Sequence, residues 1–530
     1  MPIPTGGAWP PPAHAPAYTR YRDWDAWYVG DPTLLADVYG RLSTAPSQRV
    51  RPGQLAGGVV GMLSRWMWGN PPRRDRRDDR IHVPVPADLA AAVAGLLFSE
   101  APALTGSKTA QAAIEGIIDG GLHTVLRHAA EIGAVLGDVY LRPVIDKDIA
   151  PKRAIATAVP ADAAIPVIRW GELVEVTFWS CLHEDRSTYV RLLEHHDVVR
   201  GAGRITYSLH EGTQQELGRA IPLTEHPDAA HLADLVDAEG SQATGLRELD
   251  VVRVPNAGPQ RAWRKLGPLK YHGRSDLDGN EPLFDRIDRV WTGWMGDIHN
   301  ARGRITVPSW MLESRGAGQG AEWDADREVY SAINAQPGDQ APTLTVTQFA
   351  IRHVEHKATI DALMEAAMRH AGLSSQTLGE EGDISMTATE SQNRERQSFV
   401  TRGDRINTWA PRLAKYVELH MAVEQKHFAG PEPELPNVAF ADSVSESPET
   451  VARTTQLLFA AEAISIETRV RRNNPDWDDT QVKEEVEKIR LDFGKSVEDP
   501  DTFTGAPPPG GQPDGDDDQA DDAGEEEQPA

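Results

Sequence analysis

The sequence has almost no cysteine and no long apolar run, and each absence excludes a class of protein. A single cysteine, Cys181, cannot form a disulfide within the chain, and a zinc ribbon, an iron–sulfur site or a CxxC redox pair needs more thiols. We interpret Cys181 as a half-buried strand residue. The longest apolar run covers residues 89–98, well short of the roughly 18 residues that span a bilayer. Residues 1–16 carry neither the basic nor the apolar region of a signal peptide. We therefore expect a protein of a reducing cytoplasm with no membrane partner.

A basic surplus is also missing. The chain has 80 acidic and 54 basic residues, a net charge of −26. Residues 501–530 contain acids but no Lys or Arg. Proteins that bind nucleic acid tightly usually neutralise phosphates with a surplus of Lys and Arg. The charge argues against tight binding through a broad basic face, but it is compatible with a surface along which DNA passes without sticking.

Motifs for chemistry are absent as well. The segment SDLDGNE, residues 275–281, resembles a calcium loop beginning at Asp276, but Glu281 stands where the sharp turn requires glycine. The pair His195–His196 lacks the HExxH spacing of a zinc site, and we expect it to be solvated or paired within a strand. The sequence contains no phosphate-binding loop and no G-x-S-x-G elbow. It therefore predicts no catalytic residue, no cofactor and no metal.

The distribution of apolar residues predicts a mixed α+β fold with disordered ends. Residues 1–17 are rich in proline with few apolar anchors, and residues 501–530 are rich in Pro and Gly and then acidic, so neither end is expected to join a core. Residues 18–280 change from helical spacing to short strand-like runs separated by Gly, Pro and Asp. The rest is largely helical and ends in a helical pair, 448–472 and 478–493.

Two amphipathic helices are predicted on either side of a short β-containing segment. Residues 281–303 carry apolar side chains at steps of three or four, and residues 350–372 repeat the pattern. Residues 304–349 between them contain short strand-like runs. The apolar stripes must meet a partner, which is either a core shared within one chain or an interface with neighbouring copies. The candidate packing residues are Ile287, Trp291, Trp294, Ile298 and Leu363.

A Gly-rich acidic loop precedes a long polar helix. Residues 373–386 contain Glu380, Glu381 and Asp383. Thr387 and Glu390 then fit the capping box that begins a helix. Residues 390–398 have no apolar member, which suits a helix beside water or a solvent-filled channel.

Six segments occur in an order that is typical of one family. They are DWDAWYVGDPTLLADVYG (23–40), VPVPADLAAAVAGLLFSEAP (83–102), AEIGAVLGDVYLRPVID (130–146), GRSDLDG (273–279), KATIDALMEAAMRHAGLSSQTLG with TATESQNRER (357–396), and NNPDWDD with the helix that follows it (from 473). In this succession the chain resembles the portal proteins, or head-to-tail connectors, of tailed bacteriophages, most of all those of siphophages that infect actinobacteria. The resemblance covers residues 18–495 and rests on packing and capping patterns.

The resemblance implies a portal-type fold with a specific division of the chain. The expected parts are an α/β wing (18–280), stem helices (281–303 and 350–372), a clip (304–349), a channel loop (373–386), and a long helix with a helical crown (387–500). It implies a homo-oligomeric ring of about twelve copies. Double-stranded DNA would pass through the ring during packaging and ejection without tight binding. The other expected partners are the terminase packaging motor, a head-completion or tail adaptor protein and the major capsid protein. The expected location is the portal vertex of the virion capsid, after assembly in the host cytoplasm.

Two other classes remain open. Another virion structural or scaffold component would also be acidic. That interpretation does not explain why a helix, a β segment, a second helix and an acidic loop follow one another in this order. A cytoplasmic α+β enzyme without a recognisable motif predicts a defined apolar pocket with converging polar groups. The portal interpretation predicts no enzyme activity and no such pocket.

Overall fold

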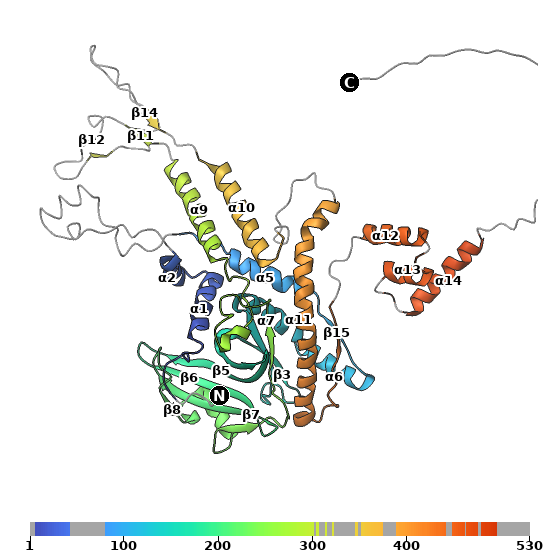
Figure 1. Ribbon diagram of the computed structural model, residues 1–530, viewed down its shortest axis with the longest axis horizontal. Helices are drawn as coiled ribbons and strands as arrows, with labels where there is room; N and C mark the ends of the chain where they lie inside the picture. The colour runs from blue at the N-terminus through green and yellow to red at the C-terminus, as the bar shows by residue number, and fades with distance from the viewer. Residues whose placement is uncertain are drawn as a thin grey trace, which may run out of the picture. The chain divides into compact units, whose positions relative to one another are not determined.

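The computed structural model (Figure 1) describes residues 6–42, 80–301, 304–306, 313–314, 321–322, 345–347, 351–374, 388–440, and 448–495 except 462, 475, 476 and 478. The chain divides into two units, residues 1–441 and 442–530. Helices and antiparallel sheets both contribute to the first unit, so the predicted mixed α+β class is confirmed. Among the residues described, no helix is long and apolar enough to cross a membrane.

The N-terminal helices α1 (Ala15–Val29) and α2 (Pro32–Leu42) supply large aromatic side chains to the main core. Asp31 caps α2, because its Oδ1 accepts hydrogen bonds from the backbone N–H groups of Thr33 at 2.7 Å and Leu34 at 3.2 Å. Trp24 and Trp27 of α1 are completely buried. The same core also contains buried residues of α9 and α10, so the N-terminal helices pack against elements that come much later in the chain.

The prediction that residues 1–17 are disordered is wrong for residues 6–17. Trp9 is buried, and its ring meets that of Trp179 edge-on with ring centres 5.4 Å apart. The Trp9 N–H also donates to the carbonyl of Gln215 at 2.8 Å. A single large aromatic anchor fixes this proline-rich segment against the sheet, although its composition is poor in apolar residues.

Two antiparallel sheets form the centre of the first unit. The larger has the order β4-β5-β6-β7-β8, with β9 paired to β7, and the smaller has the order β10-β2-β3. The strands of the larger sheet are β4 (Ala164–Arg169), β5 (Glu172–Glu184), β6 (Tyr189–Val199), β7 (Ala202–Gly212), β8 (Arg219–Ile221) and β9 (Ser241–Ala243). Those of the smaller sheet are β2 (Asp138–Val144), β3 (Ile155–Pro160) and β10 (Val252–Pro255). The β-rich stretch predicted from the sequence is thus present.

Short elements and four more helices, one of them a single turn, complete the described part of residues 80–280. The helices are α5 (Val85–Phe98), α6 (Lys108–Asp119), α7 (Leu122–Leu136) and the single turn α8 (Pro227–Ala230). Strand β1 (Ala103–Thr105) pairs with β15 (Asn437–Ala439). The 3₁₀ turns are Ala161–Ala163, Leu223–Glu225, His231–Asp234 and Pro268–Tyr271. Cys181 lies in β5 as predicted, but it is exposed rather than half-buried.

Helices α9 (Glu281–Asn300) and α10 (His353–Ala371) lie side by side and project away from the sheets (Figure 1). Beyond α9, β11 (Arg304–Thr306) pairs antiparallel with β14 (Thr345–Thr347). Farther along the chain, β12 (Glu313–Ser314) pairs with β13 (Ala321–Glu322). The predicted sequence of helix, short strands and helix is present, and the pairing of β11 with β14 brings the two ends of the intervening segment together.

The long helix α11 (Ala388–Phe428) continues through Gly403 and Pro411 and packs against earlier elements of the first unit. Its buried residues include Trp409, Leu413 and Tyr416, which share a core with α5, α6 and α7. We expected residues 387–500 to form one part of the chain, but the division between units falls within that range. The apolar face of α11 explains this, because it is buried against elements that precede it in the sequence.

The second unit contains three helices in the residues described: α12 (Pro448–Ala460), α13 (Ile466–Asn473) and α14 (Asp479–Lys495). Val470, Val482 and Val486 form its core. The single helix predicted over 448–472 is therefore wrong. Ser465 begins a new helix there, because its Oγ accepts a hydrogen bond from the N–H of Thr468 at 3.2 Å.

A buried ion cluster connects the two sheets. His196 of β6 contacts Asp250 through Nδ1 at 2.8 Å and Glu194 through Nε2 at 3.0 Å, and Arg142 of β2 pairs with Glu194. Burial by itself lowers the pKa of His196, but the charges and hydrogen bonds of Asp250 and Glu194 outweigh it and raise the pKa to about 9. The pair His195–His196 is thus strand-paired and buried, not solvated.

We predict that this cluster makes stability fall as the pH rises from 7 to 10. The folded-state pKa of His196 lies above its unfolded value, so its contribution is complete below the unfolded pKa and is lost as the pH passes about 9. Urea unfolding should show a loss of about 2–3 kcal/mol over this range for the wild type, and His196→Gln should lack that loss. His195→Gln is the matched control, because burial lowers the pKa of His195 to about 4 and keeps it neutral throughout. An equal pH dependence in wild type and His196→Gln would contradict the assignment.

We also predict that Trp409 holds α11 against α5. Its ring packs edge-on against Phe98 with ring centres 5.1 Å apart, and the side chain is buried. Trp409→Ala should lower the free energy of unfolding by about 3–5 kcal/mol in chemical denaturation. Trp170→Ala serves as a control because Trp170 is 92% exposed, and it should change stability by less than about 0.5 kcal/mol. Similar losses in the two variants would contradict the packing role of Trp409.

Candidate functional site

The helix pair α9–α10 is the candidate site, and its two halves differ. Near the sheets, Phe284, Ile287 and Met368 are buried in the core that contains α1, α2 and α5. Trp291 and Leu363 are half-buried against the same core. A core shared within one chain therefore accounts for the inner half of the apolar stripes.

The outer half of the pair keeps apolar and aromatic side chains near solvent. Ile298 is 44% exposed and Val354 is 62% exposed. Trp294 is half-buried and lies between two rings, stacking on Trp291 with ring centres 5.3 Å apart and on His356 with ring centres 6.0 Å apart. These side chains form a strip at the outer end of the helix pair, and we call Trp291, Trp294, Ile298, Val354 and His356 the outer strip.

Asp297 fixes the arrangement of the outer strip. Its Oδ2 accepts from Nε2 of His356 at 2.9 Å and from Nη2 of Arg352 at 3.1 Å. These hydrogen bonds, first that of His356 and then that of Arg352, lower the pKa of Asp297. Asp297 therefore orients the His356 ring against Trp294 and joins α9 to α10 at the end farthest from the sheets.

At the other end, a turn of residues 275–280 anchors α9 to three other elements. Asp276 pairs with Arg405 of α11 at 2.7 Å, and the side-chain N–H of Asn256 donates to the same carboxylate at 3.0 Å. Ser275 donates to the carbonyl of Val135 in α7 at 2.5 Å, and the Asn280 amide donates to the carbonyl of Ala367 in α10 at 3.3 Å. We call this turn with Arg405 and Asn256 the polar root of the helix pair.

The carboxylates of the calcium-like segment serve in this anchoring. Asp276 is the partner of Arg405, and Asp278 pairs with Arg20 of α1 at 2.8 Å. Glu281 accepts from Trp24 Nε1 at 2.9 Å. No cluster of His, Cys, Asp and Glu with the geometry of a metal site occurs in the described part of the chain. The segment therefore connects the start of α9 to α1 and α11 through ion pairs.

An acidic face of α9 was missed by the sequence analysis. Asp285 pairs with Arg80 at 2.5 Å. Asp288 accepts from the hydroxyl of Tyr39 at 2.6 Å and from the N–H of Val83 at 2.8 Å. Together with Glu281, these carboxylates recur at steps of four and three and lie buried against the N-terminal elements. That spacing beside the apolar stripe is the signal that could have identified them.

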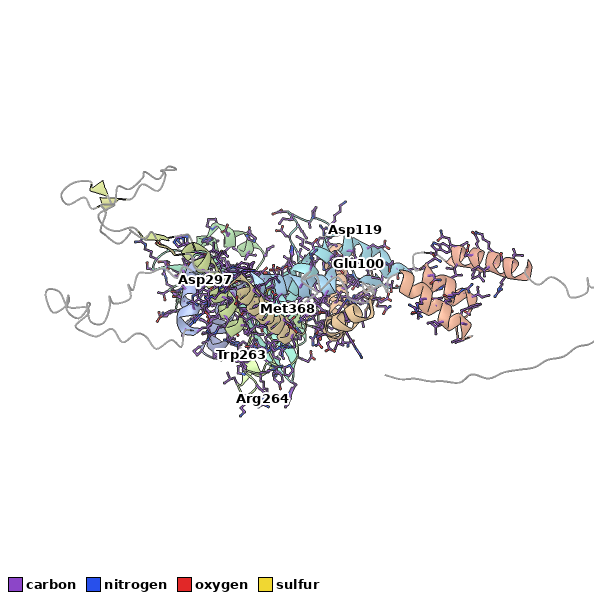
Figure 2. The ribbon with its side chains drawn as sticks, turned by 90° about the horizontal axis from the view of Figure 1, so that it is seen from above. Glu100, Asp119, Trp263, Arg264, Asp297 and Met368 are labelled. Atoms are coloured by element: carbon purple, nitrogen blue, oxygen red, sulfur yellow. The ribbon has the colours of Figure 1, made fainter. Side chains whose placement is uncertain are left out.

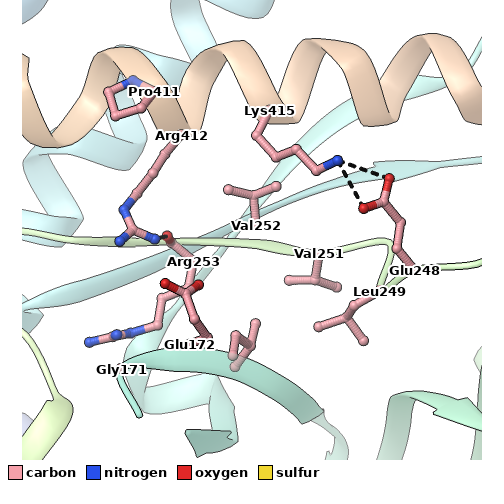
Figure 3. A pocket seen from close by; sticks show the side chains of 11 residues that line it. Gly171, Glu172, Glu248, Leu249, Val251, Val252, Arg253, Pro411, Arg412 and Lys415 are labelled. Carbon is pink, nitrogen blue, oxygen red and sulfur yellow. Dashed lines mark hydrogen bonds and ion pairs between the residues drawn. The ribbon is translucent and has the colours of Figure 1, made fainter. Parts of the chain in front are cut away.

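A hollow between α11 and the turn from β4 to β5 bears on the enzyme alternative (Figure 3). Its volume is about 450 Å³, and Leu249, Val251 and Val252 provide apolar lining. Its cations are already engaged. Lys415 pairs with Glu248 at 2.8 Å, and Arg412 donates to the carbonyl of Arg253 at 2.9 Å. A hollow is present where the portal interpretation predicts none, but its described polar groups do not form a nucleophile and base pair.

Several predicted site residues lie outside the description. Residues Glu380, Glu381, Asp383 and Thr387 are among those that the structure does not describe. Glu390 lies in α11, but its side chain is also outside the described residues. The acidic channel loop and the capping box stay predictions.

Comparison with known proteins adds no further constraint: no family model matches the chain, and no curated protein matches it.

We predict that the polar root is coupled across the chain. Arg405 is only 4% exposed, so removing its partner leaves a buried unpaired charge. Asp276→Asn and Arg405→Met should each lower the free energy of unfolding by about 3–5 kcal/mol, and the double variant should lose clearly less than the sum. Chemical denaturation measures the cycle, and hydrogen exchange should report faster exchange in α9 for Asp276→Asn.

Lys357→Met is the control for this cycle. It removes the exposed ion pair with Asp361 and should cost less than about 1 kcal/mol. Additive losses in the double variant would show that Asp276 and Arg405 act independently and would contradict the coupling.

Proposed function

We propose that the chain is a portal-type subunit, a member of the ring at a phage capsid vertex through which double-stranded DNA is packaged and ejected. The observation that carries the proposal is the outer strip on a projecting antiparallel helix pair. Burying large apolar side chains contributes about 1.5–3 kcal/mol each, and Ile298 and Val354 of the outer strip are exposed in the described part of the chain. A neighbouring copy with the same helix pair would cover them in a closed ring.

The order of elements supports the proposal. In the proposed portal-type subunit, residues 18–280 form the wing, and α9 and α10 form the stem. Residues 304–349, whose ends are joined by β11 and β14, form the clip, on which the terminase motor and later the adaptor protein dock. Residues 373–386 form the channel loop, and α11 with the helices of the second unit follows as the long helix and crown. The major capsid protein surrounds the ring, and the complex resides in the virion.

The charge of the chain supports passage of DNA rather than tight binding. About twelve copies at −26 each carry roughly 300 negative charges, which would keep DNA mobile in a central channel. The force that moves DNA would then come from the motor. A scaffold protein would share the charge, but it would have no use for a rigid helix pair anchored at both ends by ion pairs.

We predict that the outer strip controls assembly. Ile298→Asp places a charge where the side chain is already 44% exposed, so the subunit should fold, whereas the apolar contact with a neighbouring copy is lost. Native mass spectrometry should show a shift from rings to monomers, and Trp294→Asp should have the same effect.

Trp170→Asp is the matched control for the tryptophan variant, because this exposed tryptophan lies on the turn from β4 to β5. It should leave rings intact, and thermal unfolding should show that all three variants are folded. Rings of Ile298→Asp and Trp294→Asp with wild-type mass would contradict the proposed stem interface.

A further inference from the structure

A cationic segment stands out in this acidic chain. Residues 251–275 contain no Asp or Glu, although the chain as a whole carries −26. Their basic residues are Arg253, Arg261, Arg264, Lys265, Lys270 and Arg274. Arg253 is buried and pairs with Asp138 at 2.6 Å, so it belongs to the core. We call the exposed part, residues 261–270, the basic loop.

The basic loop is a folded projection. Trp263 and Leu269 are buried, and the Trp263 ring packs against Tyr21 and Trp24 of α1 with ring centres 6.1 and 6.0 Å away. The N–H of Leu266 donates to the carbonyl of Trp263 at 2.8 Å, and the N–H of Lys270 donates to the carbonyl of Leu266 at 3.0 Å. These contacts fix the fold of the loop, whose four cations lie within ten residues of one another along the chain. Figure 2 shows Arg264 farther from the body of the molecule than Trp263.

The four cations of the loop have no negative partner in the described structure. Arg261, Arg264, Lys265 and Lys270 are all exposed, and none of them forms an ion pair with a described carboxylate. Lys270 lies over the ring of Tyr271, with Nζ 4.6 Å from the ring centre. Like charges held close together repel one another, so the loop gains free energy from a partner that brings negative charge.

We propose that the basic loop binds the phosphate backbone of duplex DNA without sequence preference. Lys and Arg on a projecting surface can neutralise phosphates, and each neutralised phosphate releases counterions. No residue of the basic loop lines the hollow of Figure 3. The choice of DNA over an acidic protein rests on the proposed function. The acidic remainder of the chain keeps the contact weak and local.

Fluorescence anisotropy with a labelled 30-base-pair duplex tests the proposal. The loop variant Arg261→Gln/Arg264→Gln/Lys265→Gln/Lys270→Gln is compared with the full-length wild type between 20 and 200 mM salt. The matched control is Lys108→Gln/Lys147→Gln/Lys152→Gln/Arg186→Gln, which removes four exposed cations elsewhere and changes the net charge equally. Thermal unfolding and native mass establish that the three proteins are folded and equally assembled.

We expect the loop variant to bind at least tenfold more weakly than the wild type at 50 mM salt, and the control to bind within about threefold of it. The slope of log K against log salt should become less steep by up to about 3.6, which is four contacts at 0.9 each. The proposal would be overturned if both variants lost the same affinity for the duplex, or if the loop variant bound it as tightly as the wild type does. It would also be overturned if the loop bound labelled polyglutamate in place of the duplex. The assay requires no ring, so absence of rings would contradict only the proposed function.

Discussion

The buried ion pair between Asp276 and Arg405 is the interaction on which the arrangement of the first unit depends. It joins the turn that begins α9 to the long helix α11, and Asn256 forms a hydrogen bond with each of the two partners. Buried charges are costly unless they are paired and hydrogen-bonded. The pair therefore defines one position of α9 relative to α11 with little tolerance for alternatives, and the same turn also contacts α7 and α10.

The helix pair is held at both ends by carboxylates but differs along its length. Close to the sheets, the acidic face of α9 binds the N-terminal elements and the apolar side joins the main core. Farther out, Asp297 orients His356 beside Trp294, and apolar side chains are exposed. In the proposed function, a neighbouring copy of the same helix pair covers this strip, which extends along two helices.

Local patterns predicted much of the fold, whereas contacts between distant residues were not predictable from them. The helix start at Asp31 and the stripes of α9 and α10 follow from spacing and capping rules that operate within a few residues. Asp276 and Arg405 are 129 positions apart, and neither has a local signature of pairing. Trp9 similarly anchors a segment whose composition indicates disorder. The contact of this one large side chain with the sheet has more effect than the low apolar content of the segment as a whole. The apolar stripes of its two helices located the candidate site in the sequence. The polar root could be identified only from the structure, because its residues are far apart in the sequence.

Cryo-electron microscopy of the purified full-length protein tests the central claim most directly. The account predicts closed rings of about twelve copies, with α9 and α10 of adjacent copies in contact through the outer strip and an axial opening wide enough for duplex DNA. Particles in which the outer strip faces solvent in every copy, or assemblies without an axial opening, would contradict it.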